Sequence, residues 1–302
     1  MNMHALLKKK SLNGWYLFWL ISAPISALVM IELFSTDVST GSGVSHMIGY
    51  SVRFAVPLIF IVTAASALQT LFPSAASGWL LRNRKYIGLS FAVSMAWQGL
   101  FIFTMSMFFR DYYYEDVYLL RDEIEGSVGY LFLAAMVVTS FRFGRRHLSQ
   151  RQWKLLHTSG VYFLWAYPFS TYWWTVAGYY GEIDNSAIVF YWAGFLAFAA
   201  RIAAWGKQRM QSVAKDSSLE SSSLSARIIG GMFIGVGLYA SATVAYWQQP
   251  VSAWLTAQDW SANMSLWLAY WPFEPFLALM TIGLGTMIVS GARRKQRVAV
   301  AV

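Results

Sequence analysis

The chain alternates between long apolar segments and short polar loops. A helix that crosses a membrane needs about 20 predominantly apolar residues, at a rise of about 1.5 Å per residue. The pattern therefore predicts eight transmembrane helices, near residues 14–34, 47–68, 87–109, 127–143, 155–178, 186–205, 228–247 and 267–290. Proline removes a backbone donor, so Pro272 and Pro275 predict a kink or an interruption in the eighth segment.

Lysine and arginine are distributed unevenly among the loops. Eight spans with cytoplasmic termini would place 20 of the 23 basic residues on the cytoplasmic side, where such residues are normally enriched. We therefore expect both termini and the loop 207–226 to be cytoplasmic, with 110–126 and 249–264 facing outward. The formal net charge of +9 thus reflects topology and does not indicate a nucleic-acid partner.

The composition agrees with a membrane protein. The chain is 57% hydrophobic, 18% aromatic and 12% charged, whereas soluble domains carry about 25% charged residues. An ordinary soluble enzyme is excluded, and the predicted fold class is an all-α integral membrane protein with about eight transmembrane helices. Because there is no cysteine, disulfides, iron–sulfur clusters and thiolate metal sites are excluded as well. The imidazoles available as ligands are those of His4, His46, His147 and His157.

A polar, serine-rich stretch at 207–226 separates the first six predicted spans from the last two. Its composition is typical of a flexible linker. It separates a predicted six-helix membrane core, residues 1–206, from two further helices and a basic tail, residues 227–302. Within the seventh span, Gly231 and Gly235 have the small-xxx-small spacing that permits close contact with a neighbouring helix.

Polar residues inside spans are candidates for function because burying them in lipid is unfavourable. Glu32 and Arg53 are predicted to pair near the outer leaflet, the alternative being that each reaches the interface separately. Gln98, in the middle of the third span, needs a hydrogen-bond partner. Glu274 is a proton or cation candidate if the helix is interrupted there, and otherwise a carboxylate at the outer rim.

The outer loop 110–126 contains six carboxylates and four tyrosines. Hard oxygen ligands of this kind can hold Ca²⁺ or Fe³⁺. No EF-hand spacing is present, and a solvated acidic rim is the alternative interpretation.

Four short motifs follow one another between residues 46 and 205. They are HMIG at 46–49, RNRKYIGL at 82–89, TS at 139–140 and WKLLH at 153–157. In their order and spacing the chain resembles the ferric-reductase-like transmembrane domain, and within it the MsrQ-type haem b membrane subunit that serves methionine sulfoxide reductase. The resemblance implies a six-helix bundle that carries electrons across the membrane.

The resemblance also implies haem ligands at positions that this chain fills differently. The third-span ligand position falls on Gln98. The two fifth-span positions fall on His157 and on Ser170, or on Thr171 if the alignment shifts by one residue. His157 is the only imidazole among them, so the pair of histidines that such proteins use for haem cannot be assembled from matching positions.

Other residues offer partial substitutes. A thioether such as that of Met95 can ligate haem iron, whereas His46 lies at the opposite membrane face from His157 and cannot share its iron. We therefore expect no bound cofactor. In this interpretation His157 is an interfacial histidine hydrogen-bonded to the basic loop. The alternative is haem b held in part by His157, alone or together with Met95.

The function predicted from these residues is that of a membrane subunit of a larger assembly in a bacterial-type inner membrane, degenerate at the haem sites. Its expected partners are the lipid bilayer and a membrane or cytoplasmic protein. No flavin or nicotinamide domain follows the sixth span, so electrons would have to come from a separate protein or from quinol, and the sequence leaves enzymatic activity open. The alternatives are an active haem b electron-transfer subunit, in which Arg53 and the basic inner loops place anionic groups, and a quinone-binding, lipid-binding or transport protein.

Overall fold

The fold is known from a computed structural model that describes residues 3–179, 183–216, 218–257 and 274–294. It consists of two compact units, Met1–Pro168 and Phe169–Val302, whose boundary falls inside helix α8 (Gln150–Val176). Helices dominate both units. Strand structure among the described residues is confined to one short antiparallel pair.

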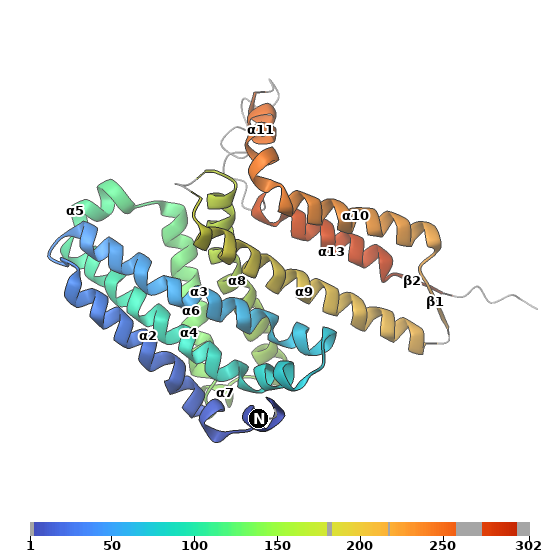
Figure 1. Ribbon diagram of the computed structural model, residues 1–302, viewed down its shortest axis with the longest axis horizontal. Helices are drawn as coiled ribbons and strands as arrows, with labels where there is room; N and C mark the ends of the chain where they lie inside the picture. Colours follow the sequence, from blue (N-terminus) through green and yellow to red (C-terminus); the bar gives the residue numbers. More distant parts are fainter. Residues whose placement is uncertain (1–2, 180–182, 217, 258–273, 295–302) are drawn as a thin grey trace, which may run out of the picture. The chain divides into compact units, whose positions relative to one another are not determined.

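Unit 1 is built around three long helices that run side by side (Figure 1). These are α2, α3 and α4, and α4 packs against both of the others. Helix α3 is the most buried of the three and buries apolar side chains that include Val44, Met47 and Ile59. The elements of unit 1 are α1 (Met3–Leu6), η1 (Lys10–Leu12), α2 (Trp15–Ser35), α3 (Gly41–Leu71), α4 (Ala75–Phe108), α5 (Arg110–Tyr112), a π-helical turn η2 (Tyr113–Val117), α6 (Leu120–Thr139), α7 (Arg142–Arg145) and the first part of α8.

Side-chain caps determine where the long helices of unit 1 begin. Thr40 accepts a hydrogen bond from the amide of Gly43 at the start of α3. Ser74 and Ser77 bond to each other's backbone amides at the start of α4, in a capping box. These caps provide partners for amides that the first helical turn leaves unpaired.

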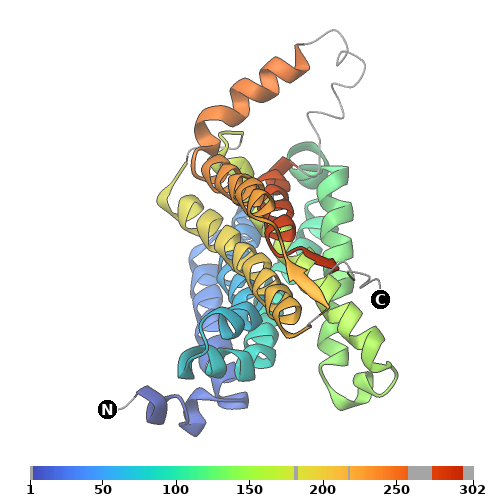
Figure 2. The same cartoon turned by 90° about the vertical axis from the view of Figure 1, so that its right-hand side faces the viewer.

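Unit 2 contains a close antiparallel helix pair, α10 and α13, that lie side by side in both views (Figures 1 and 2). The strands β1 and β2 join the same end of the pair, with Leu219 opposite Arg294 and Ser221 opposite Ala292. The elements of unit 2 after α8 are α9 (Asn185–Lys215), β1 (Leu219–Ser221), α10 (Leu224–Ala242), α11 (Val244–Thr256), a 3₁₀ turn η4 (Glu274–Phe276), α13 (Leu277–Val289) and β2 (Ala292–Arg294).

The contact between α10 and α13 uses different glycines from those predicted. A Cβ atom built on Gly230 would lie 2.6 Å from the carbonyl oxygen of Gly285, and one on Gly237 would lie 2.7 Å from the carbonyl oxygen of Ala278. The predicted residues, Gly231 and Gly235, have no atom within 4 Å of such a Cβ. Spacing alone does not say which side of a helix faces its neighbour.

Five described helices, α2, α3, α4, α9 and α10, are long and apolar enough to cross a membrane. This confirms an all-α, membrane-embedded protein. Helices α6 and α8 overlap the predicted fourth and fifth spans, but α6 begins with acidic residues and α8 is rich in tryptophan and tyrosine, which lower the hydropathy of both. The eighth span is described only from residue 274, so the count of eight spans stays a prediction.

The predicted flexible linker is in large part regular structure. Helix α9 continues through 207–215, β1 follows at 219–221, and Ser223 caps the start of α10. Residues 207–226 contain neither glycine nor proline, and the stretch beginning at Lys207 is made of good helix formers. The change to polar residues at Lys207 therefore marks the end of the apolar span, although the helix α9 continues to Lys215.

The predicted seventh span, 228–247, is divided between two helices. Helix α10 ends at Ala242, and α11 starts at Val244 in a new direction (Figure 1). The indole of Trp247 donates to the carbonyl oxygen of Ala240 at 2.9 Å, so the start of α11 folds back against the end of α10.

Candidate functional site

His157 is positioned by the way α8 begins. The Ser149 hydroxyl accepts from the amide of Gln152, and the Gln152 side chain accepts from the amide of Ser149, at 3.2 and 2.9 Å. This capping box sets the start of the helix. Trp153 and His157, four residues apart, then share one face of α8, and their rings lie 4.4 Å apart.

The end of α6 binds both of these rings. The Trp153 indole donates to the carbonyl oxygen of Thr139 at 3.2 Å, and Nε2 of His157 lies 3.0 Å from the Thr139 hydroxyl. That hydroxyl donates its proton to the carbonyl oxygen of Ala135 at 2.7 Å. The direction of the contact between Thr139 and His157 depends on the tautomer of the imidazole.

Two arginines bring positive charge to this end of unit 1. The guanidinium carbon of Arg145 lies 4.3 Å from the centre of the Trp153 ring, within the range of a cation–π interaction. Nη1 of Arg145 is buried and makes no hydrogen bond to the part of the chain that the structure describes. The charges of Arg84 and Arg145 both act on His157, so the histidine, which contacts Thr139 of α6, lies in a cationic surrounding.

Gln98 has the hydrogen-bond partner that the sequence required. The Tyr130 hydroxyl, on α6, lies 3.0 Å from both the Gln98 side-chain oxygen and the carbonyl oxygen of Met95. Gln98 and Met95 are thus level with Tyr130.

These contacts test whether the chain can hold a haem between its third and fifth predicted spans. Tyr130 and Thr139 are separated by nine residues of α6, which is roughly 14 Å along a helix. Gln98 and the backbone of Met95 therefore lie at a level far from His157, and Nε2 of His157 is already engaged. The residues present do not fit an iron ligated from both helices.

The other fifth-span ligand positions contribute no imidazole either. Ser170 is half-buried and Thr171 is exposed, and both belong to the part of α8 in unit 2, 13 and 14 residues after His157. Their hydroxyl groups are weak substitutes for a histidine ligand.

The carboxylate of Glu32 contacts the imidazole of His46, whereas the partner predicted for it was Arg53. Nε2 of His46 lies 2.7 Å from a carboxylate oxygen of Glu32. Helices α2 and α3 form an antiparallel hairpin that turns at residues 36–40, so position 32 is level with position 46. Arg53, exposed on α3, lies seven residues further along, roughly 10 Å from that level. The predicted Glu32–Arg53 pair was wrong because it ignored the register of the hairpin.

The acidic loop 110–126 packs its tyrosines against one another. The rings of Tyr113, Tyr114 and Tyr118 lie 5.3 to 5.8 Å apart. Burial, and then the charge and hydrogen bond of Glu123, raise the pKa of Tyr113. Within the described ranges no three His, Cys, Asp or Glu side chains gather as a metal site, so nothing favours the metal interpretation of this loop.

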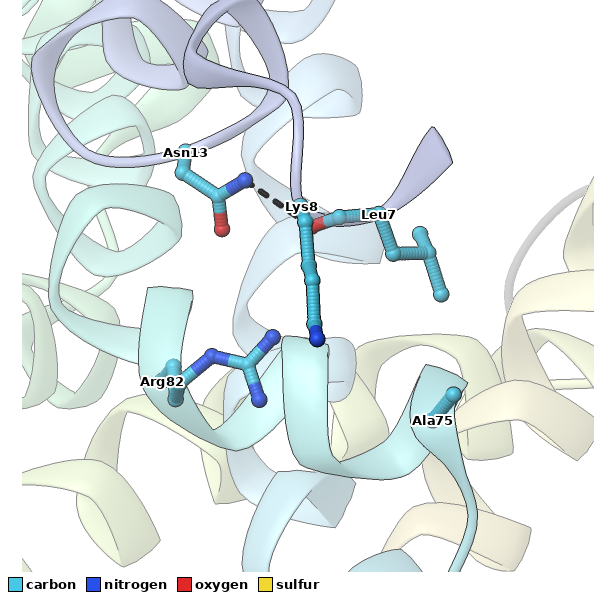
Figure 3. A pocket seen from close by; sticks show the side chains of 5 residues that line it. All are labelled: Leu7, Lys8, Asn13, Ala75 and Arg82. Carbon is cyan, nitrogen blue, oxygen red and sulfur yellow. Dashed lines mark hydrogen bonds between the residues drawn. The ribbon is translucent and has the colours of Figure 1, made fainter. Parts of the chain in front are cut away.

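A basic cavity that the sequence did not suggest lies beside the first turns of α4. It has a volume of about 370 Å³ and is lined by Leu7, Lys8, Asn13, Ala75 and Arg82. Figure 3 shows the Lys8 ammonium and the Arg82 guanidinium extending into the same space. The described residues that line the cavity include two basic side chains and no carboxylate, so its electrostatic character suits an anion.

Hydrogen bonds hold the N-terminal segment against α4 and so form this cavity. Asn83, 2% exposed, accepts from the amide of Gly14 at 3.0 Å and donates to the Asn13 side chain at 2.9 Å. Trp79 donates to the carbonyl oxygen of Leu12 at 2.8 Å. The sequence predicts that the basic residues Lys8 and Arg82 lie on the same side of the membrane, but their convergence on one cavity depends on these contacts.

Comparison with protein-family models, with curated proteins and with solved structures finds no match to this chain. The function is therefore argued from its own residues.

Proposed function

We propose that this protein is a haem-independent membrane subunit, built on a six-helix architecture of the ferric-reductase-like kind and serving a larger assembly. It would lie in a bacterial-type inner membrane with both termini in the cytoplasm, where its basic loops meet a membrane or cytoplasmic partner. The apolar helices support the membrane location, and the distribution of basic residues supports the orientation.

The observation that carries the proposal is that Gln98 and His157, at two of the implied ligand positions, both form hydrogen bonds to α6. Gln98 is bonded at the level of Tyr130 and His157 at the level of Thr139, roughly 14 Å apart along one helix. Each polar group already has the partner that a buried polar group requires. An electron-transfer role through a haem shared by these helices would need both contacts to break.

The proposal is tested by measuring haem in protein expressed with an ample haem supply. We expect no stoichiometric b-type signal in reduced-minus-oxidised and pyridine haemochrome spectra. The matched variants are His157→Ala and His147→Ala, since His147 lies in the basic loop between α7 and α8. A stoichiometric signal that disappears in His157→Ala and persists in His147→Ala would establish the electron-transfer alternative instead.

The basic cavity favours a second candidate function, the binding of an anionic lipid. Lys8 and Arg82 converge on it, and the first turn of α4 adds the positive end of a helix dipole. Cytoplasmic leaflets carry anionic lipids that attract basic groups near the surface. The cavity does not favour a quinone in the same way, because a quinone is uncharged and the cavity presents two cationic side chains to its ligand.

Lipid binding can be tested by native mass spectrometry of the protein released from detergent with phosphatidylglycerol or phosphatidylcholine. We expect selective retention of phosphatidylglycerol, lost in the double variant Lys8→Ala with Arg82→Ala. The control is Lys9→Ala, whose side chain is exposed and does not line the cavity. Equal retention of the two lipids, or unchanged retention in the double variant, would reject this function.

A further inference from the structure

Glu274 is a half-buried carboxylate in the apolar part of unit 2 that the proposed function does not use. It opens the 3₁₀ turn η4, and regular α-helix begins only at Leu277. Its side chain is therefore not on the regular face of a spanning helix.

The contacts of α10 with α13 and with α9 show how far η4 lies from the start of α9. Gly230 packs against Gly285 and Gly237 against Ala278, and continuing that antiparallel register places Ser241 level with η4. The Tyr191 hydroxyl donates to the carbonyl oxygen of Ser241 at 2.9 Å. Tyr191 is six residues from the start of α9, so the turn lies roughly 9 Å inside the end of that helix.

The side chain of Gln248, which contacts Glu274, has an amide oxygen that receives no hydrogen bond from the described residues. Gln248 of α11 is 3% exposed and donates its Nε2–H to the carboxylate of Glu274. Among the residues that the structure describes, its own Oε1 is buried without a hydrogen-bond partner, and the same holds for Oγ of Ser241. Buried polar atoms are almost always paired, so the unpartnered Oε1 of Gln248, beside the carboxylate, indicates a missing donor or cation.

Charge balance specifies what is missing. Burial and the Gln248 hydrogen bond are the influences on the Glu274 carboxylate among the described residues, and no charged side chain of those residues acts on it. Tyr191, the titratable group nearby on α9, already donates its hydroxyl to Ser241, and α8 contributes Phe169, whose ring packs on Phe276. A single buried negative charge without a counter-charge is strongly disfavoured, and one positive charge would neutralise it.

We propose that Glu274 and Gln248 form a binding site for a small monovalent cation, either Na⁺ held between the carboxylate and the amide oxygen or a proton on the carboxylate. The amide oxygen and nitrogen of Gln248 share one carbon, so the unpartnered Oε1 stays close to the carboxylate that the nitrogen contacts. Carboxylate and carbonyl oxygens are the ligands that hard cations select. A divalent ion would leave an excess positive charge in the same apolar surrounding.

The experiment measures thermal unfolding of the purified full-length protein, in sodium chloride and in choline chloride of equal ionic strength, at mildly acidic and at alkaline pH. Bound Na⁺ would raise the melting temperature at alkaline pH. Each tenfold increase of sodium beyond its dissociation constant would lower the unfolding constant about tenfold. A bound proton would instead give stabilisation on acidification in choline, with no response to sodium.

Glu274→Gln keeps the size of the side chain and removes its charge, so it should abolish either response. The control is Glu115→Gln, which changes an exposed carboxylate in η2 and should leave the response unchanged. If Glu274→Gln does not fold, Gln248→Leu replaces it and should weaken the sodium response while keeping the carboxyl. A wild-type protein indifferent to both sodium and pH would overturn the proposal. So would a sodium or pH response that survives in Glu274→Gln, or a sodium response that Gln248→Leu leaves unchanged.

Discussion

Alanine substitutions along α10 should separate the glycines that contact α13 from those that do not. A methyl group at Gly230 would lie 2.6 Å from the carbonyl oxygen of Gly285, and one at Gly237 would meet both Ile282 at 2.6 Å and the carbonyl oxygen of Ala278 at 2.7 Å. Backbone oxygens cannot rotate away as a flexible side chain can. The two helices would therefore have to move apart.

The size of the effect follows from two opposing terms. Replacing a helical glycine by alanine favours the folded state by roughly 0.5–1 kcal/mol, while overpacking a close contact costs about 1–3 kcal/mol. We expect Gly230→Ala and Gly237→Ala to lower the free energy of unfolding by about 1–2 kcal/mol. Gly231→Ala and Gly235→Ala, which meet no atom within 4 Å, should raise it by up to about 1 kcal/mol.

The assay is unfolding in mixed micelles with increasing sodium dodecyl sulfate, followed by tryptophan fluorescence. The two classes of variant should differ by about 2 kcal/mol, a factor of about 30 in the unfolding constant. The glycine assignment would be refuted if Gly230→Ala and Gly231→Ala unfold at the same detergent fraction.

Three further predictions concern unit 1 and the topology. Because the chain has no cysteine, Ser39→Cys should react with a membrane-impermeant thiol reagent in intact cells while Gln211→Cys does not, and the reverse labelling pattern would invert the proposed orientation. Tyr130→Phe removes the hydroxyl that bonds α4 and should lower the free energy of unfolding by about 1 kcal/mol, whereas the exposed Tyr114→Phe should leave it unchanged in the same detergent titration. Hydrogen bonds from Ser39 lower the pKa of Asp37, so their stabilisation is complete at neutral pH and is lost as the pH falls through the folded-state pKa. Asp37→Asn should therefore reduce the pH dependence of the melting temperature below the ordinary aspartate range, and an unaltered acid limb would contradict this account.

The positions of the helices could be predicted from the sequence because the length of an apolar run is a local property. The predicted first span, 14–34, and the helix Trp15–Ser35 differ by one residue at each end. Helix ends beyond the membrane were less predictable. Lys207 was assigned to a linker because it is polar, although polar residues without glycine or proline continue a helix as readily as they end one.

The partners of the candidate residues were less predictable because they depend on register between helices. Glu32 meets His46 through the position of the turn between α2 and α3, and Gln98 meets Tyr130 through the packing of α4 on α6. Neither pairing follows from the period of one helix. The need of Gln98 for a partner was predictable from chemistry, but the identity of that partner was not.

The pairing of β1 with β2 has a consequence for biosynthesis. It joins residues 219–221 to 292–294, and the close glycine contacts of α10 also wait for α13. Chains are synthesised from the N-terminus, and their domains generally fold in that order. Unit 1 has all of its residues available to fold while unit 2 is still being translated, whereas the α10–α13 pair can close only after α13 and β2 have been synthesised. A ribosome stalled before residue 277 would leave the glycine face of α10 uncovered, as a substrate for membrane quality control.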